Sequence, residues 1–492
     1  MTATRSHIVR GFTATLLARA IYMGSTAVLM LVLARYLLSP DAYGSLFWVI
    51  GILSVVQLAA DLGIGKAAAR YLAEYRTRDP GQIPHLLRAT VSYKLVVLAV
   101  VAGALLVAHD PLAAALGEPS VAPFFAVGAV YVVANSFAGF SQVALQGFNR
   151  LEYSAAVQSG TAVVRTAVAI ALAAAGLGAL GAFLGYVAGA AVGAAIGLGV
   201  LYVKFYRTHE AAPRFEPGLP RRLLEYSVPL TATRSANVLD KQIDIVLVGA
   251  ILNPAAVAFY TLAKQITDFA LAPADSLGFA LSPNFGEGKA AGDVAEIRTL
   301  YRTALEHTLL LYVPAATGLA IVAGPFVSLV VGADYADAVP VLRVLAAFVV
   351  LQAITNVTSD GLDYLGRARS RAIAKGATSV ANFVLNLLLI PTVGIVGAAA
   401  ATVVTHTIYV AINLRIVHAE LSLPVREIAH SVVTIGAITL AMAIAVTLVA
   451  PMISGPITLA SAVALGGAVW AVLAVGSGLV DPGVVRRTLA SV

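Results

Sequence analysis

The sequence contains no cysteine and few charged side chains. Because none of its 492 residues is Cys, the chain can form no disulfide, no thiolate nucleophile and no cysteine-ligated metal site. Only 12% of the residues are charged, against about 25% in an ordinary soluble domain, while 59% are hydrophobic. Most side chains must therefore face lipid or other helices, and little of the chain is left for a water-soluble domain.

The motifs of common catalytic and nucleotide-binding sites are also missing. The glycine-rich segments Gly63–Lys66 and Gly286–Lys289 lack the glycine spacing and the Ser or Thr of a phosphate-binding P-loop. No HExxH zinc-protease pattern occurs, and the larger segments between apolar stretches lack a DxD-type metal site. We expect no catalytic residue, no cofactor and no bound metal, so the protein is predicted not to be an enzyme.

Long apolar stretches run through the whole chain, and about 20 such residues suffice to cross a membrane. The predicted spans are 12–37, 43–65, 85–108, 121–146, 155–177, 179–203, 223–251, 256–281, 303–331, 338–364, 372–391, 394–415, 429–450 and 456–479. The first follows Arg5 and Arg10 as a signal-peptide core would, but it is too long for one and is predicted to be an uncleaved span. The segments Lys66–Pro84, Lys204–Arg222 and Pro283–Arg302 mix charge with apolar periodicity and are predicted to form interfacial helices that link the spans.

The charges of the loops predict an orientation. Basic residues such as Arg76, Arg222 and Arg426 lie in the loops that follow even-numbered spans. The loops after odd-numbered spans contain no Lys or Arg and carry acids such as Asp41 and Asp334. By the positive-inside rule, we expect a multi-pass protein of the cell membrane with both termini in the cytoplasm. Since the formal net charge of +7 is spread over these loops, no nucleic-acid partner is expected.

Three short motifs recur in the same order in the two halves of the chain. They are Leu38-Ser39-Pro40 with Leu252-Asn253-Pro254, Gly147-x-x-Arg150 with Gly366-x-x-Arg369, and Gly178-x-x-Gly181 with Gly394-x-x-Gly397. Each pair stands at equivalent places in the order of spans, which predicts two six-helix lobes related as parallel repeats. The predicted lobes are residues 1–210 and 211–420, and two additional C-terminal helices occupy residues 421–492.

Several of these segments carry a family resemblance. Residues 34–44 (ARYLLSPDAYG) resemble the first outer turn of polysaccharide flippases, and residues 61–65 (DLGIG) resemble the end of their second span. Residues 335–338 (YADA) and 385–399 (LNLLLIPTVGIVGAA) are similar to their C-terminal signatures. The chain thus resembles the polysaccharide and lipid-linked oligosaccharide flippases of the multidrug/oligosaccharidyl-lipid/polysaccharide exporter superfamily. The resemblance implies about fourteen transmembrane helices, with two helix bundles facing each other across a central cavity.

Charged and polar side chains lie deep inside several predicted spans, although a cation there costs about 2.5–3.5 kcal/mol. In spans 1, 2, 7 and 8 they share one helix face, and in the resembled family these four helices line the cavity. The predicted substrate-binding residues are Arg19, Arg165, Arg234, Lys241 and Lys264. The residues predicted to line the cavity, balance these charges or couple transport to an ion are Tyr22, Gln57, Asp61, Asn237, Asp240, Asp244 and Asp268.

These features predict a flippase that moves a lipid-linked oligosaccharide from the cytoplasmic to the outer leaflet by alternating access of the two lobes. The resemblance implies a lipid carrier, which would be a polyprenyl or dolichyl phosphate or diphosphate. Arg side chains suit its phosphate, because the planar guanidinium can bind phosphate oxygens bidentately. The expected partners are this substrate and the membrane lipids, and a coupling proton or sodium ion is left open.

Three alternatives stay open. A small-molecule or multidrug exporter of the same superfamily would suit a net acidic cavity, whereas the deep charges here lean cationic. A membrane-embedded sugar polymerase or glycosyltransferase would be expected to hold its catalytic groups in a sizeable segment outside the membrane, and the outer loops are short. Finally, the pairs Lys241 with Asp244 and Lys264 with Asp268 could merely neutralise each other along their helices.

Overall fold

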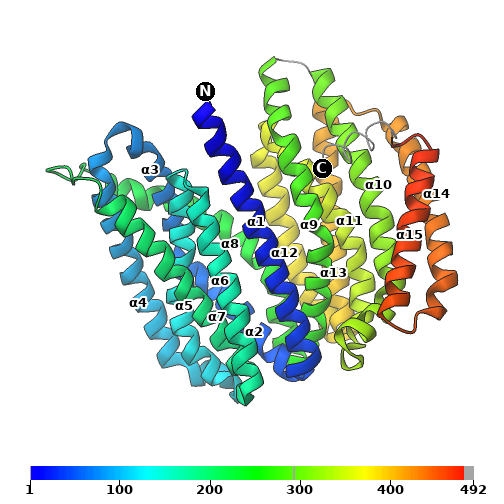
Figure 1. Ribbon diagram of the computed structural model, residues 1–492, viewed down its shortest axis with the longest axis horizontal. Helices are drawn as coiled ribbons and strands as arrows, with labels where there is room; N and C mark the ends of the chain where they lie inside the picture. The colour runs from blue at the N-terminus through cyan, green and yellow to red at the C-terminus, as the bar shows by residue number, and fades with distance from the viewer. Residues whose placement is uncertain (1, 292–293, 481–492) are drawn as a thin grey trace. The chain divides into compact units, whose positions relative to one another are not determined.

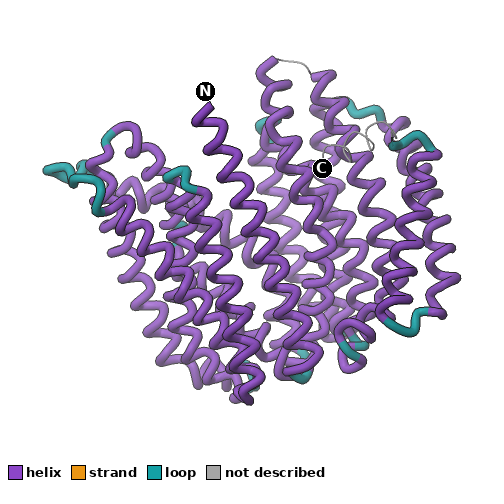
Figure 2. Tube along the Cα trace, viewed as in Figure 1, coloured by secondary structure: helices purple, strands orange, loops and turns teal. Residues whose placement is uncertain are grey.

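The computed structural model describes the backbone of residues 2–291 and 294–480, and helix is the only regular secondary structure within these ranges (Figure 2). The described side chains exclude those of residues 2–10, 12, 232–234, 236–237, 273–291, 360 and 363–364. The helices shown in Figure 1 are α1 (Thr2–Val32), α2 (Pro40–Asp61), α3 (Ile64–Arg78), α4 (Ile83–Ala115), α5 (Ala122–Gly147), α6 (Leu151–Leu172), α7 (Gly178–Leu201), α8 (Leu219–Ile251), α9 (Pro254–Ala291), α10 (Val294–Phe326), α11 (Ala338–Tyr364), α12 (Ala368–Val393), α13 (Ile395–Leu421), α14 (Val425–Val449) and α15 (Pro456–Gly476).

A helix lies on every predicted span, and α3 is the additional one. It occupies most of the segment Lys66–Pro84, as predicted. Within Lys204–Arg222, by contrast, residues 207–218 are not helical, so the prediction of an interfacial helix there is wrong. Among the described residues, 11 helical segments are long and apolar enough to cross a membrane, and one of these runs from Leu151 to Tyr206 through both α6 and α7. Neither α8 nor α9 is among them; α8 carries four charged residues between Arg234 and Asp244. An all-helical chain with many membrane-spanning helices is thereby confirmed, while the count of fourteen spans stays a prediction.

The recurring motifs adopt similar local structures. Ser39 accepts a hydrogen bond from the backbone N–H of Ala42 at 3.3 Å, and Asn253 accepts one from Ala256 at 2.8 Å. In each case the next residue is a proline at the first position of the helix, where its missing N–H costs nothing. Gly178 and Gly394 both have positive φ, of 55° and 71°. The sequence motifs therefore mark equivalent helix starts in the two halves.

The chain divides into two compact units, Met1–Ala258 and Phe259–Val492. Helix α8, assigned by the repeat to the second lobe, packs in the first unit against α2 and α3. Trp48 of α2 donates its indole N–H to the carbonyl oxygen of Val246 at 3.2 Å, and a Cβ at Gly249 would overlap the indole ring. The lobe boundaries 1–210, 211–420 and 421–492 differ from this division and stay predictions from the repeat.

A stripe of glycines on α7 sets the close packing of the first unit. The stripe consists of every fourth residue, namely Gly181, Gly185, Gly189, Gly193 and Gly197, and therefore follows one helix face. Successive members face successive turns of α6 or α5. A Cβ at Gly185 would come within 2.5 Å of the Cα of Ala169, and one at Gly189 within 2.6 Å of the carbonyl oxygen of Thr161. Small residues of this kind let membrane helices approach backbone to backbone.

The segment between α7 and α8 is hydrogen-bonded to α3 and to the turn that joins α3 to α4. Tyr75 donates its hydroxyl to Glu216 at 2.5 Å, and Arg222 donates to the other carboxylate oxygen of Glu216 at 2.5 Å. Gln82 accepts the backbone N–H of Glu216 at 3.0 Å, and Ala212 donates its N–H to the carbonyl of Gly81 at 2.9 Å. The hydrogen bonds from Tyr75 and Arg222 lower the pKa of Glu216, whereas burial and Glu216 raise the pKa of Tyr75.

We predict that Gly185→Ala destabilises the protein by about 1–3 kcal/mol, because the new methyl group meets backbone atoms that cannot move aside. Gly199→Ala is the matched control, since nothing lies within 4 Å of its Cβ position and alanine favours a helix by about 1 kcal/mol over glycine. Melting temperatures of the detergent-solubilised proteins should fall for the first variant and stay equal or rise for the second. Equal behaviour of the two variants would contradict the role of the stripe.

We predict that Glu216→Gln lowers stability at neutral pH by about 1–3 kcal/mol, the contribution of hydrogen bonds to a charged group. Because the folded-state pKa of Glu216 is lowered from 4.5, its contribution is present above pH 4.5 and is lost as the pH falls through the folded value. Melting temperature measured against pH should therefore decline less steeply at acid pH in the variant. Glu210→Gln, at an exposed carboxylate of the same segment, should leave the profile unchanged.

Candidate functional site

Arg165 of α6 lies at the contact between α6 and α1. It is 9% exposed, and its Nη2 donates to the hydroxyl of Thr26 at 2.7 Å. The rings of Tyr22 and Tyr186 each lie 5.3 Å from the guanidinium carbon. The next residue, Thr166, donates its hydroxyl to the carbonyl of Ser25 at 3.1 Å. Two helices and the aromatic side chain of a third thus surround one guanidinium.

The glycine stripe makes this position possible. A Cβ at Gly189 would lie 2.7 Å from the Cβ of Arg165, so α7 can pass the base of this side chain only without one. Tyr186 lies one turn before Gly189 on α7, and its ring faces the guanidinium of Arg165. The same ring packs edge-on against Phe47, with the two ring centroids 6.4 Å apart. The backbone approach therefore sets where the cation and its aromatic neighbours lie.

The guanidinium of Arg165 keeps unused hydrogen-bonding capacity. Its Nε is buried and has no hydrogen-bond partner, and none of the described acidic side chains forms an ion pair with it. The side chain of Tyr22 is 40% exposed, so the cluster around Arg165 is accessible from the side of this ring. A buried charge without a counter-ion is costly, and inside membrane helices it is associated with substrate or ion pathways. The arrangement can bind an anion.

Asp61 and Gln57 of α2 point into the interior of the first unit. Lys94 of α4 donates to Asp61 at 3.0 Å, and Ser136 of α5 donates to the same carboxylate oxygen at 2.5 Å. Gln57 donates to the carbonyl of Val132 at 3.4 Å and accepts from Asn135 at 3.3 Å. Asp61 is 7% exposed and Lys94 is 1% exposed. Asp61 therefore balances the charge of Lys94, which is not one of the predicted substrate-binding cations.

The remaining predicted residues are placed less completely. The side chains of Arg234 and Asn237 lie outside the described residues. Asp244 is buried, whereas Lys241 and Asp268 are exposed. Six of the predicted residues each make at least one polar, ring or electrostatic contact, namely Arg19, Asp240, Lys241, Asp244, Lys264 and Asp268. Mutual neutralisation along α8 and α9 therefore stays an open alternative for these two helices.

The sequence did not single out several of the groups that matter here. Tyr186 is the one polar side chain of α7, which is otherwise apolar and rich in Gly and Ala, whereas Asn135 and Ser136 are two of several polar side chains of α5. Lys94 was recognisable as a charge inside a span, but its partner lies 33 positions away on another helix. Within the described residues, no group of three or more His, Cys, Asp or Glu side chains is arranged to hold a metal ion.

Comparison with solved structures identifies the fold. The chain superposes on the lipid II flippase MurJ, in an inward closed conformation, with a TM-score of 0.72 and 16% identity, covering 95% of this chain and 98% of that one. It superposes on an inward-facing multidrug resistance MATE family transporter with a TM-score of 0.64 and 19% identity, covering 81% and 94% of the two chains. At these identities the likeness concerns the fold alone.

Sequence relatives agree with this fold. Over 371 residues the chain is 22% identical to the probable low-salt glycan biosynthesis flippase Agl15 of Haloferax volcanii, covering 75% of each protein. Over 366 residues it is 26% identical to the lipopolysaccharide biosynthesis protein WzxC of Escherichia coli, covering 72% of this chain and 69% of that protein. The resemblance to polysaccharide flippases is thereby confirmed. The family described as "Polysaccharide biosynthesis protein" matches residues 32–340, more than half of the chain, and this multi-pass membrane protein therefore belongs to it.

Proposed function

We propose that the protein is a flippase that moves a lipid-linked oligosaccharide, on a polyprenyl or dolichyl phosphate or diphosphate, from the cytoplasmic to the outer leaflet. The observation that carries the proposal is the buried guanidinium of Arg165, which has no acidic partner among the described residues and an unused Nε–H. The names of two relatives, a probable glycan biosynthesis flippase and a lipopolysaccharide biosynthesis protein, support the same class of cargo.

The site suits both parts of such a headgroup. A phosphate oxygen would accept from Nε of Arg165, and the hydrogen bond to Thr26 could be exchanged for a second phosphate contact, giving the paired geometry that guanidinium groups favour. Tyr22 and Tyr186 combine apolar ring faces with hydroxyl groups, which match the C–H faces and hydroxyls of a sugar. The lipid tail needs no polar site, because it can remain in the bilayer while the headgroup crosses.

The direction of transport and the driving force rest on other arguments. The charge of the loops supports cytoplasmic termini, and hence loading from the cytoplasmic leaflet. In our proposal the two lobes rock about the bound headgroup, and a proton or sodium ion drives the cycle. Asp61 is not our candidate for the coupling group, because Lys94 and Ser136 already hold it in the interior.

A multidrug exporter is the second candidate, because the fold is shared with a MATE family transporter. An organic cation near Arg165 would meet a positive charge that no described carboxylate neutralises. The charge at this site therefore favours an anionic cargo over the cationic one. A sugar polymerase or glycosyltransferase gains no support from relatives named as flippases.

We predict that Arg165→Gln reduces flipping by about tenfold or more, the effect of removing hydrogen bonds to a charged group. The measurement is translocation of a fluorescent lipid-linked oligosaccharide in proteoliposomes. Removing an unneutralised buried charge should not lower the melting temperature, which a merely structural role would do. Arg343→Gln, at an exposed arginine of α11, is the matched control and should flip normally. Undiminished flipping by a folded Arg165→Gln protein would remove this residue from the site.

We predict that Asp61→Asn destabilises the protein by about 3–5 kcal/mol, because it leaves the ammonium of Lys94 buried without its counter-ion. Combining it with Lys94→Met removes both charges and should restore the melting temperature. The double variant should then flip the labelled substrate at the wild-type rate. A well-folded double variant that fails to flip would instead assign Asp61 or Lys94 to ion coupling.

A further inference from the structure

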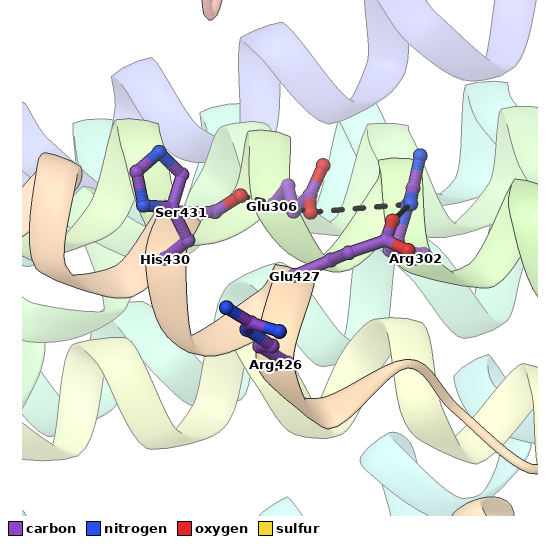
Figure 3. A pocket seen from close by; sticks show the side chains of 6 residues that line it. All are labelled: Arg302, Glu306, Arg426, Glu427, His430 and Ser431. Atoms are coloured by element: carbon purple, nitrogen blue, oxygen red, sulfur yellow. Dashed lines mark hydrogen bonds and ion pairs between the residues drawn. The ribbon is translucent and has the colours of Figure 1, made fainter.

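A separate polar pocket lies between α10 and α14 of the second unit (Figure 3). Its volume is about 400 Å³, and its lining residues are Arg302, Glu306, Arg426, Glu427, His430 and Ser431. The pocket adjoins the first two turns of α14 and the third and fourth turns of α10, toward the end of these helices that the loop charges assign to the cytoplasm. It contains none of the residues proposed to handle the oligosaccharide.

The two carboxylates of this pocket are already engaged. Arg302 forms ion pairs with Glu427 and, at 3.9 Å, with Glu306. Ser431 donates its hydroxyl to Glu306 at 3.0 Å. By contrast, the side chains of Arg426 and His430 form no hydrogen bond or ion pair within the part of the chain that the structure describes, and Figure 3 shows Arg426 apart from this network. The hydrogen-bonding capacity left for a ligand is therefore that of a basic pair.

An apolar track continues from this basic pair along α14. Arg426 and His430 are one turn apart, and the residues on the same helix face farther along are Val433, Leu440, Ile444 and Leu448. Their exposed fractions are 71%, 63%, 54% and 73%. At 1.5 Å per residue the face extends about 33 Å from Arg426 to Leu448, the thickness of a hydrocarbon core. One continuous face of α14 thus carries Arg426 and His430 near its N-terminal end and exposed apolar side chains farther along.

We propose that this face binds an anionic phospholipid of the cytoplasmic leaflet. Arg426 and His430 hold the phosphate in the pocket, and an acyl chain lies along Val433 and Leu440. Basic pockets between membrane helices on the cytoplasmic side are suited to acidic headgroups. A free phosphate could use the same two side chains, but it would gain nothing from the apolar track. The proposal does not depend on the transported substrate, because it places the lipid on residues outside the flipping site.

The test is native mass spectrometry of the full-length protein in detergent with added phosphatidylglycerol or phosphatidylcholine. We expect phosphatidylglycerol to be retained about tenfold better than phosphatidylcholine, and Arg426→Gln combined with His430→Gln to abolish the difference. Val433→Ser combined with Leu440→Ser should weaken retention of both lipids. Arg415→Gln, at an exposed arginine of α13, should change nothing.

Two outcomes would overturn the proposal. In the first, the double variant at Arg426 and His430 retains phosphatidylglycerol as the wild type does. In the second, inorganic phosphate displaces phosphatidylglycerol completely and the apolar-track variant binds it normally, so that the pocket is an anion site without lipid specificity. A flipping assay is not needed for either reading, so failure here would leave the proposed function untouched.

Discussion

Placing a cation among membrane helices is the constraint on which the first unit is built, since hydrocarbon offers no water to solvate it. The unit meets this constraint in two different ways. Lys94 is surrounded by protein and faces the carboxylate of Asp61, which is itself held by Ser136. Arg165 receives only a hydroxyl and two aromatic rings. Lys94 and Asp61 supply each other with a counter-ion, whereas the buried Nε–H of Arg165 has no partner among the described residues. We therefore propose Arg165, rather than Lys94, as the residue that meets the substrate.

Backbone packing and the cation are physically linked. The glycines of α7 bring α6 so close that side chains are excluded along one face, and the position of Arg165 is set by this approach at Gly189. Thr166 then ties α6 to α1 through the carbonyl of Ser25. A side chain as long as Arg has several rotatable bonds, and binding a substrate is favoured when these are already restricted. In the proposed site, tight packing around the base of Arg165 would therefore favour ligand binding by its guanidinium.

Much of this fold follows from the sequence because hydrophobic length is read directly along the chain. Each apolar stretch became a helix, and Ser39 and Asn253 marked helix starts through a capping interaction that spans three residues. Contacts between helices are different in kind. Thr26 and Arg165 are 139 positions apart, and nothing in either local pattern pairs them. The same limit left open which cation Asp61 balances, since the helix face it shares with Gln57 can be read from the sequence but the neighbour of that face cannot.

The shared fold does not decide what is carried, because the same architecture is found in a lipid II flippase and in multidrug transporters. Discrimination between such cargoes must come from the charge that the fold leaves without a partner. A carboxylate in that state would attract organic cations, whereas a guanidinium attracts phosphate. Arg165 is a deep cation of the first unit, and a hydroxyl and two aromatic rings are its partners among the described residues. Its surroundings, rather than the number or order of the helices, therefore favour a phosphate-bearing headgroup.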